Sequence, residues 1–406
     1  MRRVVVTGIG GVTAFGRGWE KNKKALLSYE NAVIHVADWN RYDELNTRLA
    51  APVVDYKPPS NWNRKQLSSM GKVAQMCVDA AEQALNDAGL LGDESIRDGR
   101  MGVSCGSSTG SPQDICDISR LVRDGDSSRF NANSYVRIMP HTTAANISIH
   151  FGLTGRVIPT SSACASSNQG IGYAYESIKH GLIDMMLSGG GEELCVSEAF
   201  VFDSLFAASI KNEKPKLTPS PYDANRDGLV IGEGAGILVL EEYEHAKARG
   251  AKIYAEIVGF SSNSDGSHIT RPQSETMRRC MELSLKDANL PASAIGYVNG
   301  HGTATEQGDI AETLATAEVF GHVPLSSQKS YLGHTLGACG AIEAWYSIQM
   351  MNEGWFAPTL NLQQIDERCG DLDYIVGESR PMDTEFVMSN NFAFGGINSS
   401  LIFKRY

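Results

Sequence analysis

One cysteine in this sequence lies in a local setting that favours nucleophilic chemistry. Cys164 stands in the small-residue run Ser-Ser-Ala-Cys-Ala-Ser-Ser, at or just before the start of an expected helix. Free N–H groups and the positive end of a helix dipole both favour a thiolate over a thiol. We therefore expect Cys164 to be ionised and to act as a covalent nucleophile. A buried structural cysteine is the alternative that this pattern alone leaves open.

Two histidines follow expected strands and lie in glycine-rich turns, where a side chain can face a ligand. Glycines flank His301 on both sides, and His334 lies in a turn that also holds Lys329. Glu343 stands on the helix that follows, where its carboxylate could orient His334 or pair with Lys329. The alternatives are a turn histidine satisfied by backbone groups and an ordinary ion pair, which contributes little when exposed.

Two further motifs point to other chemistries. Gly8-Ile9-Gly10 follows a strand as in a dinucleotide-binding loop, but position 13 is Thr where a third glycine belongs, which argues against a nicotinamide site. The run from Gly106 to Gly110 matches the G-x-S-x-G elbow of serine hydrolases, with Ser108 as nucleophile. Five residues match by chance in a chain rich in Gly and Ser, so the hydrolase is a minor alternative.

Composition excludes several classes of function. The net charge is −11, which argues against nucleic acid as a partner, because phosphate binding needs a positive surface. The eight cysteines form no C-x-x-C pair, so the sequence carries no zinc or redox motif. No secretory signal precedes the first strand, and no apolar run approaches the ~20 residues of a membrane span. We expect a cytoplasmic protein with reduced thiols.

The elements that must position these residues follow a repeated pattern. Short apolar runs that end in glycine-rich turns, at residues 3–7 and 101–105, alternate with helical spacing such as that of residues 66–88, which indicates an α/β protein. An internal repeat then pairs three strands of the first half with three of the second. The paired strands are expected at residues 157–162 and 323–327, 184–188 and 385–389, and 235–240 and 399–403.

This repeat predicts two similar halves, residues 1–251 with Cys164 and residues 252–406 with both histidines. A duplicated α/β pair brings the loops after equivalent strands to a shared crevice, so we expect the chemistry there. The first half is longer because of stretches rich in polar and turn residues, which suit insertions. These stretches are residues 30–65, 112–142 and 196–226.

At this level of detail the chain resembles the elongating β-ketoacyl-acyl carrier protein synthases of the thiolase-fold superfamily. The resemblance runs essentially from Arg3 to Tyr406, with six motifs in order. The motifs are Ser161-Ser-Ala-Cys164-Ala, Asp223-Ala-Asn-Arg-Asp227-Gly, Leu240-Glu-Glu-Tyr-Glu-His-Ala-Lys, Asn299-Gly-His301-Gly-Thr-Ala-Thr, Lys329 through Gly-His334-Thr-Leu-Gly-Ala, and Asn391-Phe-Ala-Phe-Gly-Gly-Ile-Asn398. The second histidine separates this Cys-His-His class from the Cys-His-Asn initiating synthases and from thiolases.

The resemblance implies a fold and a reaction. The fold is a thiolase-like αβαβα arrangement of two five-stranded-sheet halves, and the family forms dimers. Cys164 would take an acyl chain from an acyl carrier protein as a thioester. His301 and His334 would stabilise the enolate formed when a malonyl thioester loses CO2, and the carbanion would attack the thioester of Cys164. The reaction needs no metal and no other cofactor, since phosphopantetheine arrives on the carrier.

The resemblance also assigns supporting roles. Backbone N–H groups of Cys164 and Phe394 would form the oxyanion hole, and Gly395 and Gly396 would let Phe394 move as a gate. Lys329 would tune the charge near His334, and Glu343 would brace that network. Three threonines would bind substrate: Thr303 and Thr305 the phosphopantetheine arm, and Thr109 the far end of the acyl chain.

Some positions depart from the family pattern, and they bear on substrate and partner. Thr109, Ala393 and Ile397 replace residues usual in the family, so a polyketide or aryl-polyene ketosynthase is an alternative to fatty-acid synthesis. We expect the chain to form a homodimer or a heterodimer with a ketosynthase-like chain-length-factor paralogue. That this chain is itself the non-catalytic subunit of such a pair is disfavoured, because Cys164 is intact. The acidic carrier would need a basic patch, for which the candidates are Arg64, Lys65, Lys72, Lys211, Lys214 and Lys216.

Overall fold

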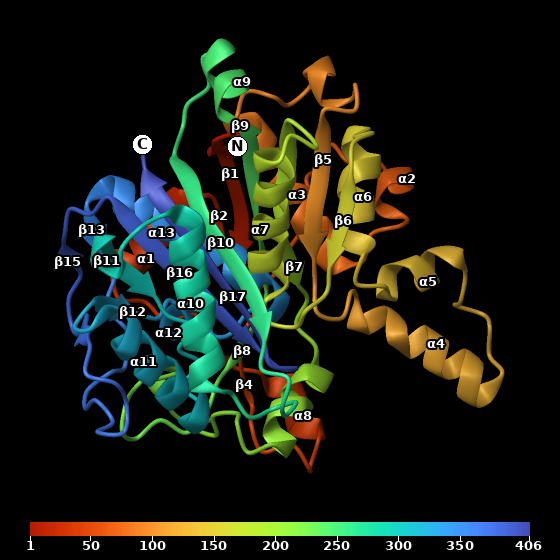
Figure 1. The fold of residues 1–406 in the computed structure, drawn as a ribbon. Helices are drawn as coiled ribbons and strands as arrows, with labels where there is room; N and C mark the ends of the chain where they lie inside the picture. Colours follow the sequence, from red (N-terminus) through yellow and green to blue (C-terminus); the bar gives the residue numbers. More distant parts are fainter.

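A single mixed sheet runs through the molecule in the computed structural model, which describes all residues from 1 to 406 (Figure 1). Its strand order is β14-β12-β11-β16-β17-β10-β1-β9-β7-β5-β6, with β2 paired to β1. The strands are β1 (Val4–Thr13), β2 (Gly16–Arg17), β5 (Met101–Gly106), β6 (Val157–Thr160), β7 (Met185–Glu192), β9 (Gly234–Glu242), β10 (Ala255–Ser264), β11 (Ile295–Asn299), β12 (Pro324–Ser326), β14 (Asp373–Tyr374), β16 (Phe386–Ala393) and β17 (Ile397–Arg405).

The helices and the short accessory strands complete the element list. The helices are α1 (Trp19–Leu27), α2 (Arg64–Leu67), α3 (Lys72–Asp87), α4 (Pro112–Asp124), α5 (Ala132–Ile138), α6 (Thr142–Phe151), α7 (Ser166–Lys179), α8 (Val196–Ser204), α9 (Tyr243–Ala248), α10 (Ser274–Ala288), α11 (Glu306–Phe320), α12 (Lys329–Leu332) and α13 (Cys339–Glu353). Two small sheets consist of β3 (Ile34–His35), β4 (Leu49–Ala51) and β8 (Ile231–Gly232), and of β13 (Trp355–Phe356) and β15 (Arg380–Pro381).

The two halves of the sheet have the same strand order, read outward from the middle. The first half is β1-β9-β7-β5-β6 and the second is β10-β17-β16-β11-β12, and β1 and β10 join them through three residue pairs. The predicted equivalence of three strand pairs is therefore confirmed, as β6 with β12, β7 with β16 and β9 with β17. The expected division after residue 251 falls between α9 and β10.

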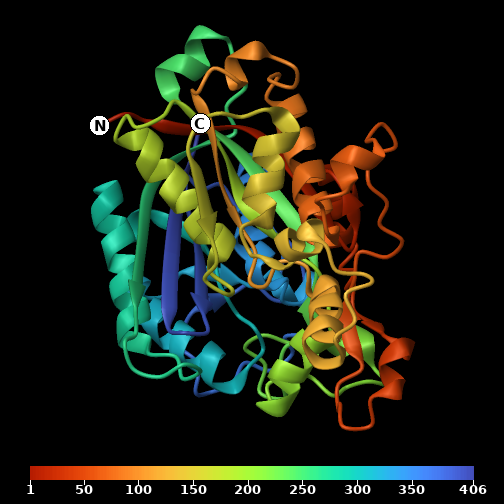
Figure 2. The same cartoon turned by 90° about the vertical axis from the view of Figure 1, so that its right-hand side faces the viewer.

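Helices form three layers around these two half-sheets, which confirms the predicted αβαβα fold (Figures 1 and 2). α3 and α6 cover the outer face of the first half, and α10, with α11 beside it, covers the outer face of the second. α7 and α13 contact strands of both halves and form the central layer. Accordingly, α13 is buried on nearly all sides, as an apolar helix in the middle of a protein must be.

The glycines of the first strand correct one prediction. Instead of ending in a glycine-rich turn near Thr7, β1 continues to Thr13. Gly8 and Gly10 lie inside the strand against α3, where a Cβ atom would come within 2.2 Å of the Ala84 carbonyl oxygen and 2.0 Å of the Ala80 carbonyl oxygen. These glycines therefore allow a helix to pack closely on the sheet, and they leave no loop for a dinucleotide.

The extra residues of the longer first half form insertions that lie outside the two half-sheets and their helix layers. Helices α4 and α5 project from the body of the molecule, and α8 lies at the opposite end from α9 (Figure 1). None of the helices is both long and apolar enough to cross a membrane.

Candidate active site

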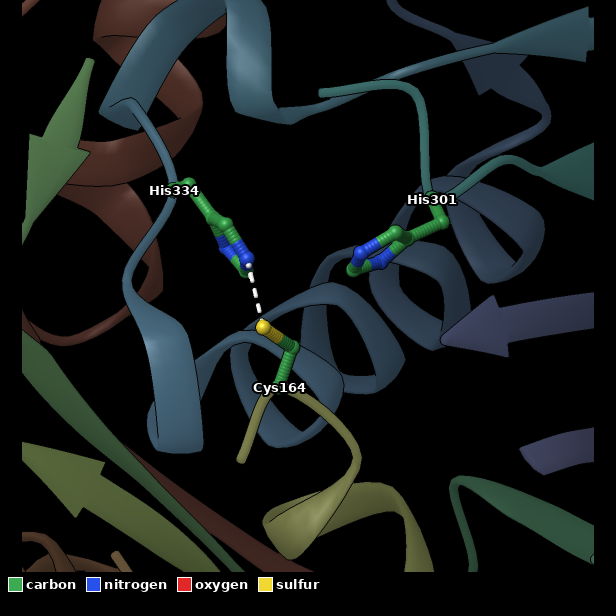
Figure 3. A group of neighbouring side chains, drawn as sticks. All are labelled: Cys164, His301 and His334. Carbon is green, nitrogen blue, oxygen red and sulfur yellow. Dashed lines mark hydrogen bonds between the residues drawn. The ribbon is translucent and has the colours of Figure 1, made fainter. Parts of the chain in front are cut away.

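Three loops from both halves of the chain bring Cys164, His301 and His334 together (Figure 3). Cys164 follows β6, His301 follows β11, and His334 lies between α12 and α13. The Nε2 atom of His334 is 2.9 Å from the Cys164 sulfur, and the two imidazole rings are 5.2 Å apart between centroids. Ligand atoms of all three residues lie within 4.8 Å of one another, so the convergence expected from the duplicated halves is present.

Cys164 occupies a sharp turn just before the central helix α7. Ala163 adopts a left-handed backbone with φ of 49°, a strained conformation for a residue with a Cβ atom. Burial raises the pKa of the Cys164 thiol to about 12, although the Lys329 cation and the backbone N–H groups of Phe394 and Cys164 act in the opposite direction. The expectation of an ionised thiol in the resting site is therefore wrong: desolvation outweighs the helix N-terminus.

Both histidines are held neutral. Burial lowers the pKa of His334 well below its ordinary value, and the Lys329 cation lowers it further. The same two causes, together with His334, lower the pKa of His301. A neutral imidazole has one N–H donor and one acceptor nitrogen. His334 can therefore accept the Cys164 proton through Nε2, and either ring can donate to a carbonyl oxygen.

Two buried carboxyl groups of α11 hold the loop that carries His301. Glu312 accepts the backbone N–H groups of His301 at 2.5 Å and Gly302 at 2.7 Å. Asp309 accepts the N–H of Thr303 at 3.0 Å. Burial raises the pKa of Glu312 to about 8 and that of Asp309 to about 6. Neither residue was singled out from the sequence. Acidic residues in a helix just after a His-Gly turn could have predicted carboxyl groups that accept hydrogen bonds from the backbone of that turn.

Lys329 and Glu343 form an ion pair behind the histidines, as one reading of the sequence predicts. Their nitrogen and oxygen atoms are 2.5 Å apart, and the side chains are 2% and 4% exposed. The alternative of an ordinary exposed pair is therefore wrong. Burial lowers the pKa of Lys329, but the Glu343 carboxylate, Cys339 and Glu312 together raise it more. The net shift is upward, and Lys329 stays cationic.

Asn391 on β16 links this ion pair to His301, and its role was missed. Its Nδ2 atom lies 2.9 Å from Glu343 Oε2 and 3.3 Å from His301 Nδ1. Its Oδ1 atom accepts a hydrogen bond of 2.9 Å from Asn168 on α7. No motif rule singles out an asparagine inside a strand, and only the packing of β16 against the central helix layer brings these groups together.

A cavity of about 510 Å³ opens onto the three residues. Its wall includes Thr303 and Thr305, whose hydroxyl oxygens are 2.9 Å apart, and also Phe394 and Gly396. Phe394 packs on Phe202 with ring centroids 5.2 Å apart. The glycines after Phe394 have φ angles of 87° and 68°, in the region that only glycine enters freely. The two threonines expected to bind the pantetheine arm thus share one cavity with Phe394 and Gly396 of the expected gate, whereas Gly395 does not line it.

Thr109 does not line this cavity. It is exposed, and its hydroxyl lies 3.5 Å from the carboxylate of Glu192, a buried residue whose pKa is raised to about 7 by burial. Contact with an acyl chain remains a prediction. The hydrolase alternative loses its support here, because the Ser108 N–H donates to Glu192 and no histidine contacts the Ser108 hydroxyl.

The six basic residues do not gather into one patch. Arg64 and Lys65 belong to α2, which lies far from α8 and the chain that follows it in Figure 1. Lys72 is bonded to the buried Glu233 carboxylate at 2.5 Å, so its charge is largely neutralised. Of the remaining three, Lys211 has its Nζ atom 3.4 Å from Asp227 Oδ1, and Lys216 donates to the Asn31 carbonyl oxygen. Lys214 is exposed.

Cys164, His301 and His334 also offer three atoms of the type that bind Zn²⁺. The buried Lys329 cation close to them opposes a second positive charge in the same place. The arrangement therefore suits a nucleophile, a proton acceptor and hydrogen-bond donors better than a metal ion.

Comparison with known proteins gives a consistent picture. Residues 1–246 match the family model described as the N-terminal domain of β-ketoacyl synthase, and residues 254–363 match its C-terminal domain. The chain is 37% identical over 418 residues to 3-oxoacyl-[acyl-carrier-protein] synthase 2 of Vibrio harveyi, covering 100% of this chain and 99% of the relative.

Solved structures agree. A β-ketoacyl synthase from Burkholderia phymatum superposes with a TM-score of 0.99 at 58% identity, over 100% of both chains. A ketosynthase solved with its type II PKS acyl-carrier protein and bound to a hexaketide gives a TM-score of 0.87 at 32% identity, over 100% of this chain and 99% of that one.

Proposed function

This chain belongs to the β-ketoacyl synthase family, and on that premise we propose that it is an acyltransferase that extends an acyl chain by decarboxylative condensation. It joins an acyl group held on Cys164 to the two-carbon unit of a malonyl-acyl carrier protein. The observation that carries this proposal is the 2.9 Å contact between Cys164 Sγ and His334 Nε2, with His301 facing both across one cavity.

Acyl loading is the first step. An acyl thioester enters the cavity, and His334 Nε2 accepts the thiol proton as the Cys164 sulfur attacks the carbonyl carbon. The N–H groups of Cys164 and Phe394, which already face the sulfur, bind the developing oxyanion. The carrier thiolate leaves and takes up the proton, so that an acyl-Cys164 thioester and a free carrier thiol result.

Condensation is the second step. Neutral His301 and His334 donate N–H groups to the thioester carbonyl oxygen of the malonyl group, where negative charge develops as CO2 leaves. The resulting enolate attacks the carbonyl carbon of acyl-Cys164, and the Cys164 sulfur leaves as a thiolate. The thiolate takes up one proton from solvent through His334, which balances the negative charge left when the malonyl carboxylate departs as CO2. Thr303 and Thr305 hydrogen-bond the pantetheine arm from the cavity wall.

The substrate class follows from the relatives. Curated relatives over the full length of the chain are named 3-oxoacyl-[acyl-carrier-protein] synthases, which favours fatty-acid synthesis with an acyl carrier protein as partner. A polyketide or aryl-polyene pathway is the second candidate, because a structural relative carries a hexaketide. Neither route requires a metal or a bound cofactor in the protein, since every proton transfer above uses Cys164 or a histidine.

A dimer is part of the proposal. Helix α4 exposes Ile115 and Val122, and β6 leaves one edge of the sheet unpaired. Apolar side chains and an open edge of this kind are usual at subunit interfaces. Light scattering of the purified chain, alone and with a ketosynthase-like paralogue, separates a homodimer from a heterodimer; a monomer in both cases contradicts the proposal.

Intact-mass spectrometry with a panel of acyl carriers tests the function. The wild type should gain the mass of one acyl group, located on Cys164, and should form a β-ketoacyl carrier when malonyl carrier is added. Cys164→Ala should abolish both reactions, whereas Ser108→Ala, which changes a residue without a histidine partner, should leave them intact. Loading that survives Cys164→Ala would refute the proposal. The acyl groups that load decide between fatty-acid and polyketide substrates.

A further inference from the structure

The two histidines of the site differ in the surroundings of Nδ1, the ring nitrogen that does not face the Cys164 sulfur in His334. The Nδ1 atom of His301 faces Asn391 Nδ2 at 3.3 Å. The Nδ1 atom of His334 is buried and has no hydrogen-bond partner. Because the partner of one ring nitrogen decides which nitrogen carries the proton, this difference bears on what each histidine can do.

The side-chain amide of Asn391 can be oriented in only one way. Its oxygen accepts from Asn168 Nδ2 at 2.9 Å, and its nitrogen donates to Glu343 Oε2 at 2.9 Å. Glu343 is a carboxylate paired with Lys329 and acts as an acceptor. A reversed amide would place its oxygen against the Glu343 oxygen and its NH₂ group against that of Asn168.

The orientation of Asn391 in turn decides the tautomer of His301. The NH₂ group lies 3.3 Å from His301 Nδ1 and 3.3 Å from the Cys339 sulfur, and an amide nitrogen cannot accept a hydrogen bond. Nδ1 of His301 is therefore the acceptor, and the single proton of the neutral ring lies on Nε2. Lys329, Glu343 and Asn391 therefore form a chain of contacts that ends at the catalytic ring. Partners of this kind fix the orientation of a functional histidine without touching the substrate.

We propose that Asn391 is a positioning residue that locks His301 as the Nε2–H tautomer, an obligatory hydrogen-bond donor toward the malonyl carbonyl oxygen. This inference rests on the proposed function, because it assigns a task within that reaction. His334, whose Nδ1 has no such partner, remains free to accept the Cys164 proton during loading and to donate during decarboxylation. Both rings thus donate during decarboxylation, but only His334 also accepts a proton during loading.

Asn391→Asp tests this proposal, because it replaces the amide NH₂ group with a carboxyl oxygen. That oxygen takes the place of Nδ2, 2.9 Å from Glu343 Oε2, so the two carboxyl groups share one proton and the oxygen keeps a lone pair and no N–H for His301. At pH 8 the proton of His301 should move to Nδ1, and Nε2 should become an acceptor. Decarboxylation of malonyl carrier should then fall by about 10²–10³-fold, the effect of losing one oxyanion-hole donor. Acyl loading of Cys164, which does not use His301, should be retained.

The matched control is Asn390→Asp. Asn390 is the next residue on β16 and is equally buried, but its amide contacts the Met281 sulfur at 3.3 Å instead of the site. This variant also buries a carboxyl group in β16, so it shows how much stability and activity an Asn→Asp change at this depth removes without any contact to His301. Asn391→Leu, which removes the amide without adding an acceptor, should lose less decarboxylation than Asn391→Asp.

The decisive readout is the ¹⁵N spectrum of histidine-labelled protein, with His301→Gln used to assign the signals. The proposal requires an Nε2–H signal for His301 in the wild type and an Nδ1–H signal in Asn391→Asp. It is overturned if the wild type shows Nδ1–H, or if Asn391→Asp decarboxylates as fast as Asn390→Asp. If Asn391→Asp does not fold, the wild-type spectrum and Asn391→Leu decide. Failure of the proposed function looks different, because the wild type then neither loads nor decarboxylates.

Discussion

Removing one member of the buried Lys329–Glu343 pair should cost far more than removing the pair. At 2.5 Å, the attraction between two unit charges is about 7 kcal/mol at an effective dielectric constant of about 20. Desolvation of each ion costs several kcal/mol, so the pair as a whole contributes little net stability. Glu343→Gln leaves the Lys329 ammonium buried without a counter-charge, and we expect it to lower the free energy of unfolding by about 3–5 kcal/mol.

The sign of the pH dependence follows from the same argument. Without Glu343, burial is the largest influence on the pKa of Lys329 and lowers it, against upward contributions from Cys339 and Glu312. We therefore expect the pKa of Lys329 in the variant to fall below that of the unfolded chain. The unfolded state then binds more protons than the folded state, so the stability of the variant rises with pH. The deficit of Glu343→Gln relative to the wild type should therefore shrink between pH 7 and pH 9.

Urea unfolding followed by tryptophan fluorescence measures these differences. Lys329→Met/Glu343→Gln should recover most of the loss, since no buried charge remains. The matched control is Glu385→Gln, which breaks a Lys–Glu pair with Lys404 at 3.4 Å that is 38% and 59% exposed; it should cost about 0–1 kcal/mol. The reasoning is refuted if Glu343→Gln costs no more than this control, or if the double variant is as unstable as the single one.

Three further predictions concern activity and packing. Both histidines have pKa values below the ordinary value of 6.5, so they should stay neutral when the pH is lowered from 8 to 5.5. The decarboxylation rate measured over this range should therefore show no protonation midpoint near pH 6.5. A midpoint there would contradict neutral rings. Charge reversal of Lys211 and Lys214 should raise KM for the carrier-bound substrate, and an unchanged, salt-independent KM would show that the carrier docks elsewhere. Gly340→Ala should lower the free energy of unfolding by about 1–3 kcal/mol in urea titrations, because a Cβ atom there would lie 2.7 Å from Asn168 of the other central helix; a neutral effect would mean that the helices can separate.

Much of the fold is predictable because the duplicated halves repeat their pattern of apolar strands and glycine-rich turns. The strand before Cys164 and the strand before Lys329 are equivalent for this reason, and equivalent strands place their loops at the same crevice. The prediction of a glycine-rich turn after residue 7 failed at β1, because a glycine can serve either a turn or close packing of a helix on a strand. Gly8 and Gly10 serve close packing on α3 instead of a turn, and only the position of that helix distinguishes the two.

The identity of the catalytic residues was predictable, but their protonation was not. The helix N-terminus at Cys164 is visible in the sequence, whereas the desolvation that raises its pKa to about 12 depends on the whole surrounding core. The contacts of Asn391 likewise join β16, α7 and α13, elements far apart in the chain. Local patterns therefore identify which groups react, and the three-dimensional packing decides their charge and tautomer.

The origin of the nucleophile and of the histidines in different halves has a consequence for biosynthesis. Cys164 belongs to the first half of the chain and His301 and His334 to the second, so a ribosome-bound chain carries the thiol long before its partners exist. The Cys164 sulfur gains its proton acceptor His334 and the backbone N–H of Phe394 only when the second half has been made and has packed against the first. Catalytic competence thus appears only after the last strands have docked, and co-expressed fragments 1–251 and 252–406 would regain activity only on reassociation.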